Sequence, residues 1–130
     1  MGTQLKNTAL EKGLLELVYF RVSQINGCAY CLDMHSKDAR AAGETEQRLY
    51  GLAAWREAPY YSERERAAFN WAEAVTACKV PDDAYEDVSR FFSENELVDL
   101  TLAITHINTW NRINIAFPHN IGTYAVGQFG

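Results

Sequence analysis

The chain has 130 residues, of which 48% are hydrophobic and 22% are charged, and its formal net charge at pH 7 is −5. This length fits one domain, residues 1–130, with a substantial core, and the composition argues against intrinsic disorder and against an integral membrane protein. Because the charge is negative and no run of Lys or Arg interrupts it, neither nucleic acid nor an anionic membrane is expected as a partner.

The N-terminal segment predicts a cytoplasmic protein and an early helix. It lacks the apolar region and cleavage site of an export signal. Thr8 and Glu11 have the spacing of a capping box, which predicts a helix start directly after Thr8. Apolar residues then recur with the helical period up to Ile25, and Asn26-Gly27 favours a left-handed helix end. We therefore expect a first helix over residues 9–25.

The second predicted helix carries the most reactive residues of the chain. It begins at or just after Cys28 and ends at Gly43, so Cys28, Cys31 and His35 fall on one face. Two cysteines three residues apart at a helix start can close a disulfide, and the helix dipole and a nearby imidazolium favour the thiolate. In a reducing compartment such a pair is more typical of a redox or metal site than of a structural disulfide. The alternative, two cysteines that merely fill a helix contact, leaves the histidine on the same face unexplained.

Glu16 is expected to meet His35 across the hairpin that these two helices form. At about 1.5 Å rise per residue, Glu16 lies about 15 Å before the turn and His35 about 10 Å after it, so the two side chains are near the same level. An antiparallel packing then gives an ordered series of carboxylate, imidazole and thiol. The alternative for Glu16 is a solvent-facing position on an amphipathic helix.

The rest of the chain predicts further helices and no strand. They are a short helix from Glu44 towards Trp55 that closes before Pro59, a helix opened by a capping box at Ser62–Glu65, a helix near Pro81, and a helix over residues 94–116 opened by a box at Ser93–Glu96. Sustained two-residue alternation between turn residues is missing from the sequence. We therefore expect an all-α bundle of about six helices.

The last predicted helix suggests a homo-oligomer. It is apolar on most of its circumference, and Asn108, Asn111 and Asn114 form an amide stripe along it. A chain of this size has difficulty covering such a helix, and the amides would suit a subunit contact. The tail from Pro118 to Gly130 is expected to be irregular, with Tyr124 and Phe129 available to pack on a neighbour.

Other reactive or aromatic residues are expected to have structural roles. Cys78 and His106 are interpreted as packing residues, the histidine with one satisfied nitrogen, and His119 is expected to be exposed. Core or subunit contact is the expectation for the larger aromatic residues Tyr19, Phe20, Trp55 and Trp71, although an apolar wall near Cys31 would suit an organic hydroperoxide.

The series Glu16, Cys28, Cys31 and His35 resembles the motif of the alkylhydroperoxidase D-like branch of the carboxymuconolactone decarboxylase family. The similarity extends through the second helix to Gly43 and its flanking residues, and it recurs in Trp110-Asn-Arg-Ile-Asn-Ile-Ala-Phe117. The resemblance implies an all-helical fold that assembles into trimers or hexamers. We expect neither a cofactor nor a bound metal.

The activity that the resemblance implies is a thiol-dependent peroxidase. Carried onto this chain, Cys31 is attacked by a small-molecule hydroperoxide, Cys28 resolves the sulfenic acid to a disulfide, and Glu16 and His35 relay protons. A dithiol or thioredoxin-like reductant then restores the thiols. One position departs from the pattern, since the alkylhydroperoxidase D proteins proper have a histidine between the cysteines where this chain has Tyr30. A phenol is a poor base at neutral pH, although it can donate a hydrogen bond.

The residues themselves leave alternatives open. The helix dipole acts most strongly on Cys28, whereas the i, i+4 relation couples His35 to Cys31, and we follow the histidine because the leaving oxygen needs an acid beside the attacking sulfur. Two Cys, one His and one Glu could also form a tetrahedral zinc site. Disulfide exchange or redox sensing with weak peroxidase activity is a further alternative. The lactone decarboxylase chemistry of the wider family does not call for the cysteine pair, and the missing strands disfavour a thioredoxin fold.

Overall fold

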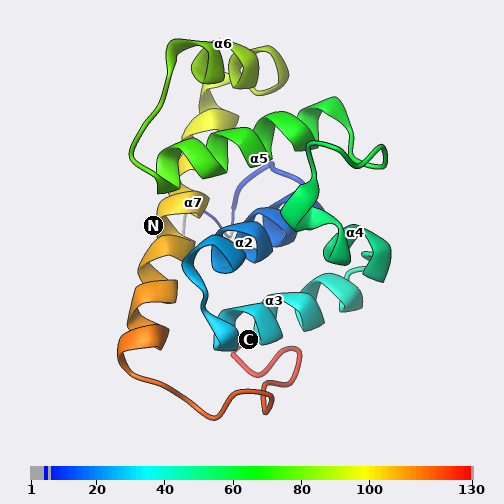
Figure 1. Cartoon of the computed structure of the whole chain (residues 1–130), viewed down its shortest axis with the longest axis vertical. Helices are drawn as coiled ribbons and strands as arrows, with labels where there is room; N and C mark the ends of the chain where they lie inside the picture. The colour runs from blue at the N-terminus through cyan, green and yellow to red at the C-terminus, as the bar shows by residue number, and fades with distance from the viewer. Residues whose placement is uncertain (1–4, 6, 130) are drawn as a thin grey trace.

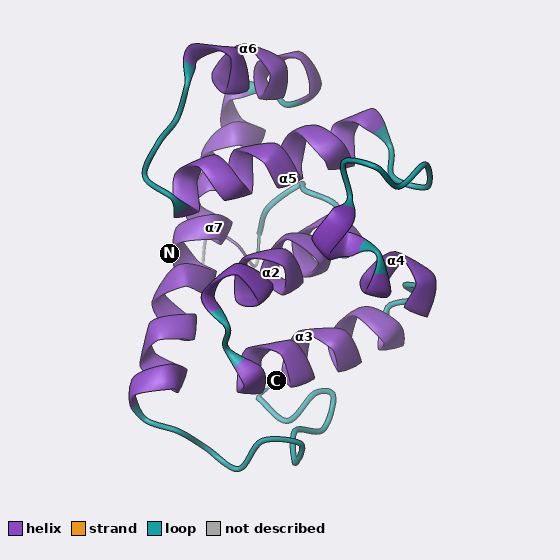
Figure 2. Ribbon diagram, in the orientation of Figure 1, coloured by secondary structure: helices purple, strands orange, loops and turns teal. Residues whose placement is uncertain are grey.

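The computed structural model describes residue 5 and residues 7–129 of the chain. Within these residues it contains six complete α-helices and one short 3-10 helix, and no strand (Figure 2). The elements are α2 (Lys12–Asn26), α3 (Ala29–Ala41), α4 (Glu46–Tyr50), η1 (Leu52–Ala54), α5 (Glu63–Thr76), α6 (Asp82–Phe91) and α7 (Glu94–Ala116). The predicted all-α bundle is confirmed.

Helix α2 is the centre of the bundle, and α3, α5 and α7 pack around it (Figure 1). Its residues Leu17, Val18 and Val22 are fully buried, as are Phe69 of α5 and Ile104 of α7. Burial of a side chain of this size contributes about 1.5–3 kcal/mol, so this core fixes α2 firmly. The helix that carries Glu16 is therefore a rigid support for the site.

The turn between α2 and α3 forms where the sequence predicts it. Gly27 adopts a left-handed conformation with φ of 71°, which glycine reaches without steric cost. The carbonyl oxygen of Ser23 accepts hydrogen bonds from the backbone N–H groups of Gly27 at 2.9 Å and Cys28 at 3.1 Å. These bonds end α2, and the chain continues directly into the segment that holds the two cysteines.

The predicted start of the first helix is wrong by a few residues, because the Thr8–Glu11 capping box does not form. Helix α2 begins at Lys12, and no side chain caps it. The Thr8 hydroxyl accepts from the backbone N–H of Leu10 at 3.2 Å and donates to the carboxylate of Asp99 on α7. Thr8 therefore bonds to a distant residue of α7 and does not cap the helix that follows it.

The predicted helix from Glu44 towards Trp55 divides into α4 and η1. Thr45 caps α4 by accepting from the backbone N–H of Arg48 at 3.3 Å. The two segments meet at Gly51, where an added Cβ would lie 2.0 Å from the Tyr60 hydroxyl oxygen. A side chain at this position would collide with Tyr60, so the close approach of that ring requires glycine here.

The two remaining capping boxes, at Ser62–Glu65 and Ser93–Glu96, are both present, and α7 covers the predicted residues 94–116. Within the described residues, none of the helices is long and apolar enough to cross a membrane.

The expected burial of Cys78 is wrong. Cys78 is exposed and follows the end of α5 with φ of 58°. Its N–H bonds to the carbonyl of Val75, and the N–H of Lys79 bonds to that of Ala74. This pair of bonds is a Schellman ending, in which the left-handed residue is usually glycine.

Candidate redox site

The two cysteines at the start of α3 form a disulfide. Their Cα atoms lie 5.3 Å apart, and Cys28 and Cys31 are only 1% and 2% exposed. Cys28 is the N-cap of α3, and its sulfur accepts a hydrogen bond from the backbone N–H of Cys31 at 3.3 Å. The expected closeness of the two sulfurs is confirmed.

The predicted contact between Glu16 and His35 is also confirmed. A carboxylate oxygen of Glu16 lies 3.0 Å from Nδ1 of His35, and both side chains are largely buried. The ring of Tyr19 lies 5.1 Å from the imidazole, centroid to centroid. Burial, with a smaller effect of the Glu16 charge, raises the pKa of Tyr19 to about 12, so this phenol stays protonated at neutral pH. The imidazole is therefore held between a carboxylate and a neutral ring.

A second carboxylate lies next to this pair. Ligand atoms of Glu16, His35 and Asp38 all lie within 4.8 Å of one another. Asp38 accepts a hydrogen bond of 2.8 Å from the hydroxyl of Tyr124 in the C-terminal tail. These three side chains could hold a metal ion, whereas the alternative zinc site built on two thiolates does not form with the sulfurs bonded to each other.

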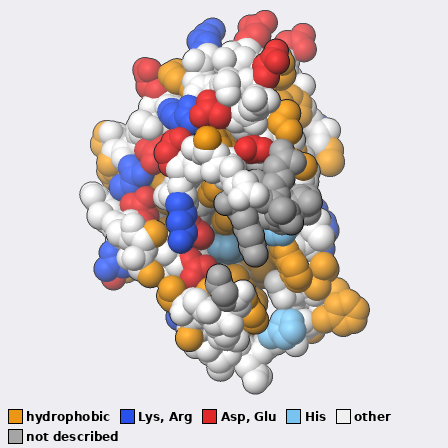
Figure 3. All heavy atoms as spheres, turned by 180° about the vertical axis from the view of Figure 1, so that it is seen from behind, with side chains coloured by type: hydrophobic (Ala, Val, Ile, Leu, Met, Phe, Trp, Pro, Cys, Tyr) orange, Lys and Arg blue, Asp and Glu red, His pale blue; other side chains and the backbone are white. Residues whose placement is uncertain are grey.

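Cys31 and His35 face a common pocket of about 820 Å³, of which Cys28 is not a lining residue. Half of the other lining residues are aromatic or apolar, and the rest are amides, histidines and one threonine: Tyr19, Tyr30, Met34, His106, Ile107, Trp110, Asn114, His119, Asn120, Thr123, Gln128 and Phe129. Figure 3 shows histidine side chains on this side of the molecule next to a gathering of hydrophobic ones. An organic molecule fits such a lining better than a small ion does.

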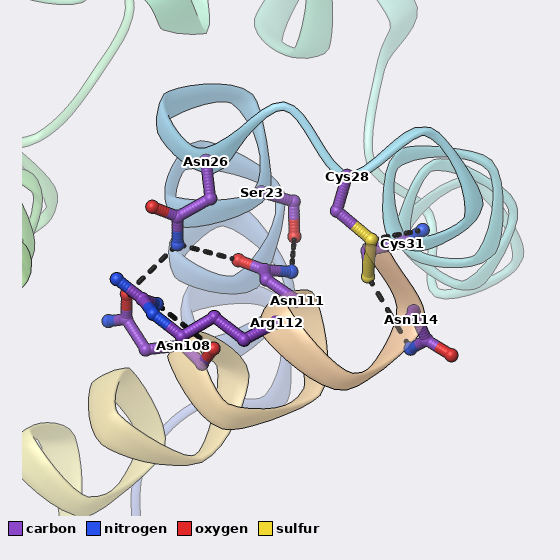
Figure 4. The surroundings of a disulfide bond; sticks show 8 residues. All are labelled: Ser23, Asn26, Cys28, Cys31, Asn108, Asn111, Arg112 and Asn114. Carbon is purple, nitrogen blue, oxygen red and sulfur yellow. Dashed lines mark hydrogen bonds between the residues drawn. A yellow bond between two sulfur atoms is a disulfide. The ribbon is translucent and has the colours of Figure 1, made fainter. Parts of the chain in front are cut away.

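The amide stripe of α7 lies against the end of α2 and the disulfide, as Figure 4 shows. The Asn111 amide donates to the Ser23 hydroxyl at 3.0 Å, and the amide of Asn26 donates to the side-chain oxygens of Asn108 and Asn111, both at 2.9 Å. The Asn114 amide nitrogen lies 3.7 Å from the sulfur of Cys31 and donates to it. Asn108 and Asn111 thus have partners within the chain and Asn114 contacts Cys31, whereas a role of this stripe in a subunit contact stays a prediction.

The tail packs on its own chain, and the expected contact with a neighbour stays a prediction. Tyr124 is buried against α3, and Lys37 donates to the backbone carbonyls of Gly122 and Tyr124. In Figure 1 this segment runs beneath α3, so it closes one side of the pocket.

The two other histidines lie at the pocket. Nε2 of His106 accepts from the Trp110 indole at 3.1 Å, which is the one satisfied nitrogen that the sequence predicts, while its buried Nδ1 has no partner among the described residues. Burial lowers the pKa of His106, which favours the neutral ring. His119 is exposed, as expected, and its ring lies 5.3 Å from that of Tyr30.

Sequence reasoning missed the lining roles of Tyr19, His106 and His119. Trp55 and Trp71 are core residues as expected. The helical period of apolar residues does not tell whether a side chain lines a pocket or packs in the core. The return of the tail over α3 has no signature in the local sequence.

The sequence and the fold of this chain are similar to those of a known protein family. The carboxymuconolactone decarboxylase family profile matches residues 1–74, more than half of the chain. The uncharacterized protein YdfG of Bacillus subtilis is 48% identical over 114 residues, which are 85% of this chain and 78% of that protein. Alkyl hydroperoxide reductase AhpD of Mycobacteroides abscessus is 44% identical over 43 residues, 33% of this chain and 25% of that protein.

A solved structure agrees over almost the whole chain. ATU0492 from Agrobacterium tumefaciens, a protein of unknown function described as a candidate AhpD antioxidant defence protein, superposes with a TM-score of 0.89 at 42% identity, covering 95% of this chain and 86% of that one. With the CxxC pair and the helical fold, these matches show that the chain belongs to the AhpD-like branch of the carboxymuconolactone decarboxylase family.

Proposed function

We propose that this protein is a thiol-dependent peroxidase that reduces organic hydroperoxides, with Cys31 as the attacking residue and Cys28 as the resolving one. The observation that carries the proposal is that Cys31 lines the pocket together with His35, whereas Cys28 does not. A hydroperoxide in the pocket would therefore meet the sulfur of Cys31 first, with an imidazole beside it.

The chemistry follows from these positions. The Cys31 thiolate attacks the terminal oxygen of the hydroperoxide, the O–O bond breaks, and the alkoxide leaves as an alcohol after it takes a proton from His35. Cys31 is then a sulfenic acid, which the Cys28 thiolate attacks to form the disulfide and release water. Glu16, 3.0 Å from Nδ1 of His35, orients the imidazole.

The cycle needs two electrons from outside. A dithiol or a thioredoxin-like protein supplies them by thiol–disulfide exchange, which returns Cys28 and Cys31 to thiols. Assembly into a homo-oligomer, as trimers or hexamers, is part of the proposal. It is supported by large apolar side chains that α7 and its C-terminal end leave exposed, among them Trp110, Ile113 and Phe117.

A second candidate is a disulfide oxidoreductase or redox sensor with weak peroxidase activity. Tyr30 favours it, because a phenol lies between the cysteines where AhpD proteins have a histidine that takes part in proton transfer. Peroxide consumption and disulfide exchange, each measured with the same dithiol reductant, separate the two functions.

The assignment of the cysteines is tested by trapping sulfenic acid. The experiment uses Cys28→Ser and Cys31→Ser, each combined with Cys78→Ser so that the exposed third thiol does not react. After addition of an organic hydroperoxide, we expect a persistent sulfenic acid in the Cys28→Ser protein and none in the Cys31→Ser protein. The opposite pattern would reverse the roles, and no sulfenic acid in either would refute the peroxidase.

A further inference from the structure

We infer that Asn114 is a catalytic residue of this site, whose amide stabilises the Cys31 thiolate before it attacks. The inference deepens the proposed function and rests on the redox role of the cysteine pair. It names a residue outside the Glu16, His35 and CxxC series that the sequence motif supplies.

The contact joins two elements that are far apart in the sequence. The Asn114 amide projects from the last turns of α7 towards the start of α3, and its nitrogen lies 3.7 Å from the Cys31 sulfur (Figure 4). Both residues line the pocket, so the amide approaches the sulfur from the side on which a substrate would bind. A group in this position touches the reacting atom itself.

The position of Asn114 is fixed by the residue one turn before it. Asn111 is fully buried and donates to the hydroxyl of Ser23, whose carbonyl accepts the backbone N–H of Cys28. The same residue of α2 thus holds both the turn into the cysteine pair and the last turns of α7. The amide of Asn114 is held near the sulfur before any substrate arrives, which is the condition for an effective electrostatic contribution.

The hydrogen bond favours one redox state over the other. A disulfide sulfur is a weak acceptor, whereas a thiolate carries a full negative charge and accepts a charge-assisted bond that is about twice as strong as a neutral one. The amide therefore stabilises the reduced, reactive state more than the disulfide. It acts together with the backbone N–H of Cys31, which serves the sulfur of Cys28, so each sulfur has its own donor.

The first test measures the redox equilibrium of the pair. Wild type, Asn114→Ala and Asn114→Asp, all with Cys78→Ser, are equilibrated at pH 8 with mixtures of reduced and oxidised dithiothreitol. We expect the equilibrium constant for reduction to fall about tenfold in Asn114→Ala, equivalent to a potential about 30 mV more negative. In Asn114→Asp, which keeps the shape but adds a negative charge, it should fall further.

The second test observes the thiolate directly. Absorbance at 240 nm reports the thiolate of Cys31 in proteins that also carry Cys28→Ser, and both Asn114 variants should show less of it at pH 7 than their parent. Asn70→Ala is the matched control, since it removes an amide from α5, where the side chain accepts from Arg56 and lies outside the site. Thermal unfolding followed by circular dichroism checks that all variants are folded.

The outcomes are distinct. A constant for Asn114→Asp that matches wild type would show that only the shape of the side chain matters, and a constant for Asn114→Ala within twofold of wild type would show that the amide does nothing for the sulfur. Either result overturns the inference. Because neither measurement uses a peroxide, a wild-type protein that fails to reduce hydroperoxides would refute the proposed function and leave the role of Asn114 to be decided by these two tests.

Discussion

Replacing Asn111 by alanine should cost the protein a large part of its stability, because this side chain joins α2 and α7 inside the core. Asn111 is 0% exposed. Its amide nitrogen donates to the hydroxyl of Ser23 at 3.0 Å, and its oxygen accepts from the amide of Asn26 at 2.9 Å. Alanine removes both hydrogen bonds and leaves a small cavity between the helices.

The size of this loss depends on which hydrogen bonds Asn26 and Ser23 keep in the variant. Asn26 keeps its hydrogen bond to Asn108 at 2.9 Å, so its amide is not stranded. The buried hydroxyl of Ser23 loses the amide of Asn111. Two hydrogen bonds at about 1 kcal/mol each, plus the penalty for a buried polar group, give a loss of about 2–4 kcal/mol in the free energy of unfolding. That is a large share of the total of about 5–15 kcal/mol that is usual for a folded protein.

Equilibrium unfolding in urea measures this loss, with the cysteines kept oxidised in every sample. A double-mutant cycle with Ser23→Ala isolates the pair, and we expect the double variant to be less destabilised than the sum of the two single variants by about 1 kcal/mol. A loss below about 1 kcal/mol for Asn111→Ala, or strict additivity in the cycle, would refute the role assigned to the buried amide.

Three further substitutions test separate parts of the account. Cys78→Gly should stabilise the protein by about 0.5–1 kcal/mol and raise Tm by a few degrees, because glycine adopts the left-handed conformation without steric cost; a lower Tm would contradict this. Burial raises the pKa of Glu73, but hydrogen bonds from Arg56 and two other side chains outweigh this effect and leave the pKa below 4.5. The ionised carboxylate therefore contributes its full share to the stability of the fold above pH 4.5, and this contribution is lost as the pH falls through the folded-state pKa. Wild type should therefore lose more stability than Glu73→Gln in urea titrations between pH 6 and pH 3, and parallel losses would contradict the ion pair. Glu16→Gln removes the charge beside His35 and should slow peroxide reduction about tenfold or more in stopped-flow assays, whereas an unchanged rate would exclude the relay.

The features that were predictable from the sequence depend on short sequence distances. The capping boxes at Ser62–Glu65 and Ser93–Glu96 are satisfied within four residues, so local reasoning was sufficient for the starts of α5 and α7. The contact between Glu16 and His35 needed only the helical rise and one tight turn, and the structure confirms it.

The features that were not predictable depend on partners far away in the chain. The hydroxyl of Thr8 donates to Asp99, 91 residues later, and so the capping box that its neighbours suggest is not formed. The amides of Asn111 and Asn114 meet Ser23 and Cys31, more than 80 residues earlier, and in the sequence they are only a polar stripe. One wall of the pocket is formed by the C-terminal tail after α7, which has no regular secondary structure and therefore no periodic sequence pattern that would predict its path.

The central claim is that a hydroperoxide oxidises the pair Cys28 and Cys31 directly, and a stoichiometric thiol titration tests it most simply. The fully reduced Cys78→Ser protein is mixed with one equivalent of an organic hydroperoxide, and free thiols are counted as a function of time, with Cys31→Ser in parallel. The account predicts that two thiols disappear for each peroxide consumed and that the product is the intramolecular disulfide, while the Cys31→Ser protein keeps its thiol. Both thiols remaining free in the presence of the hydroperoxide would contradict it.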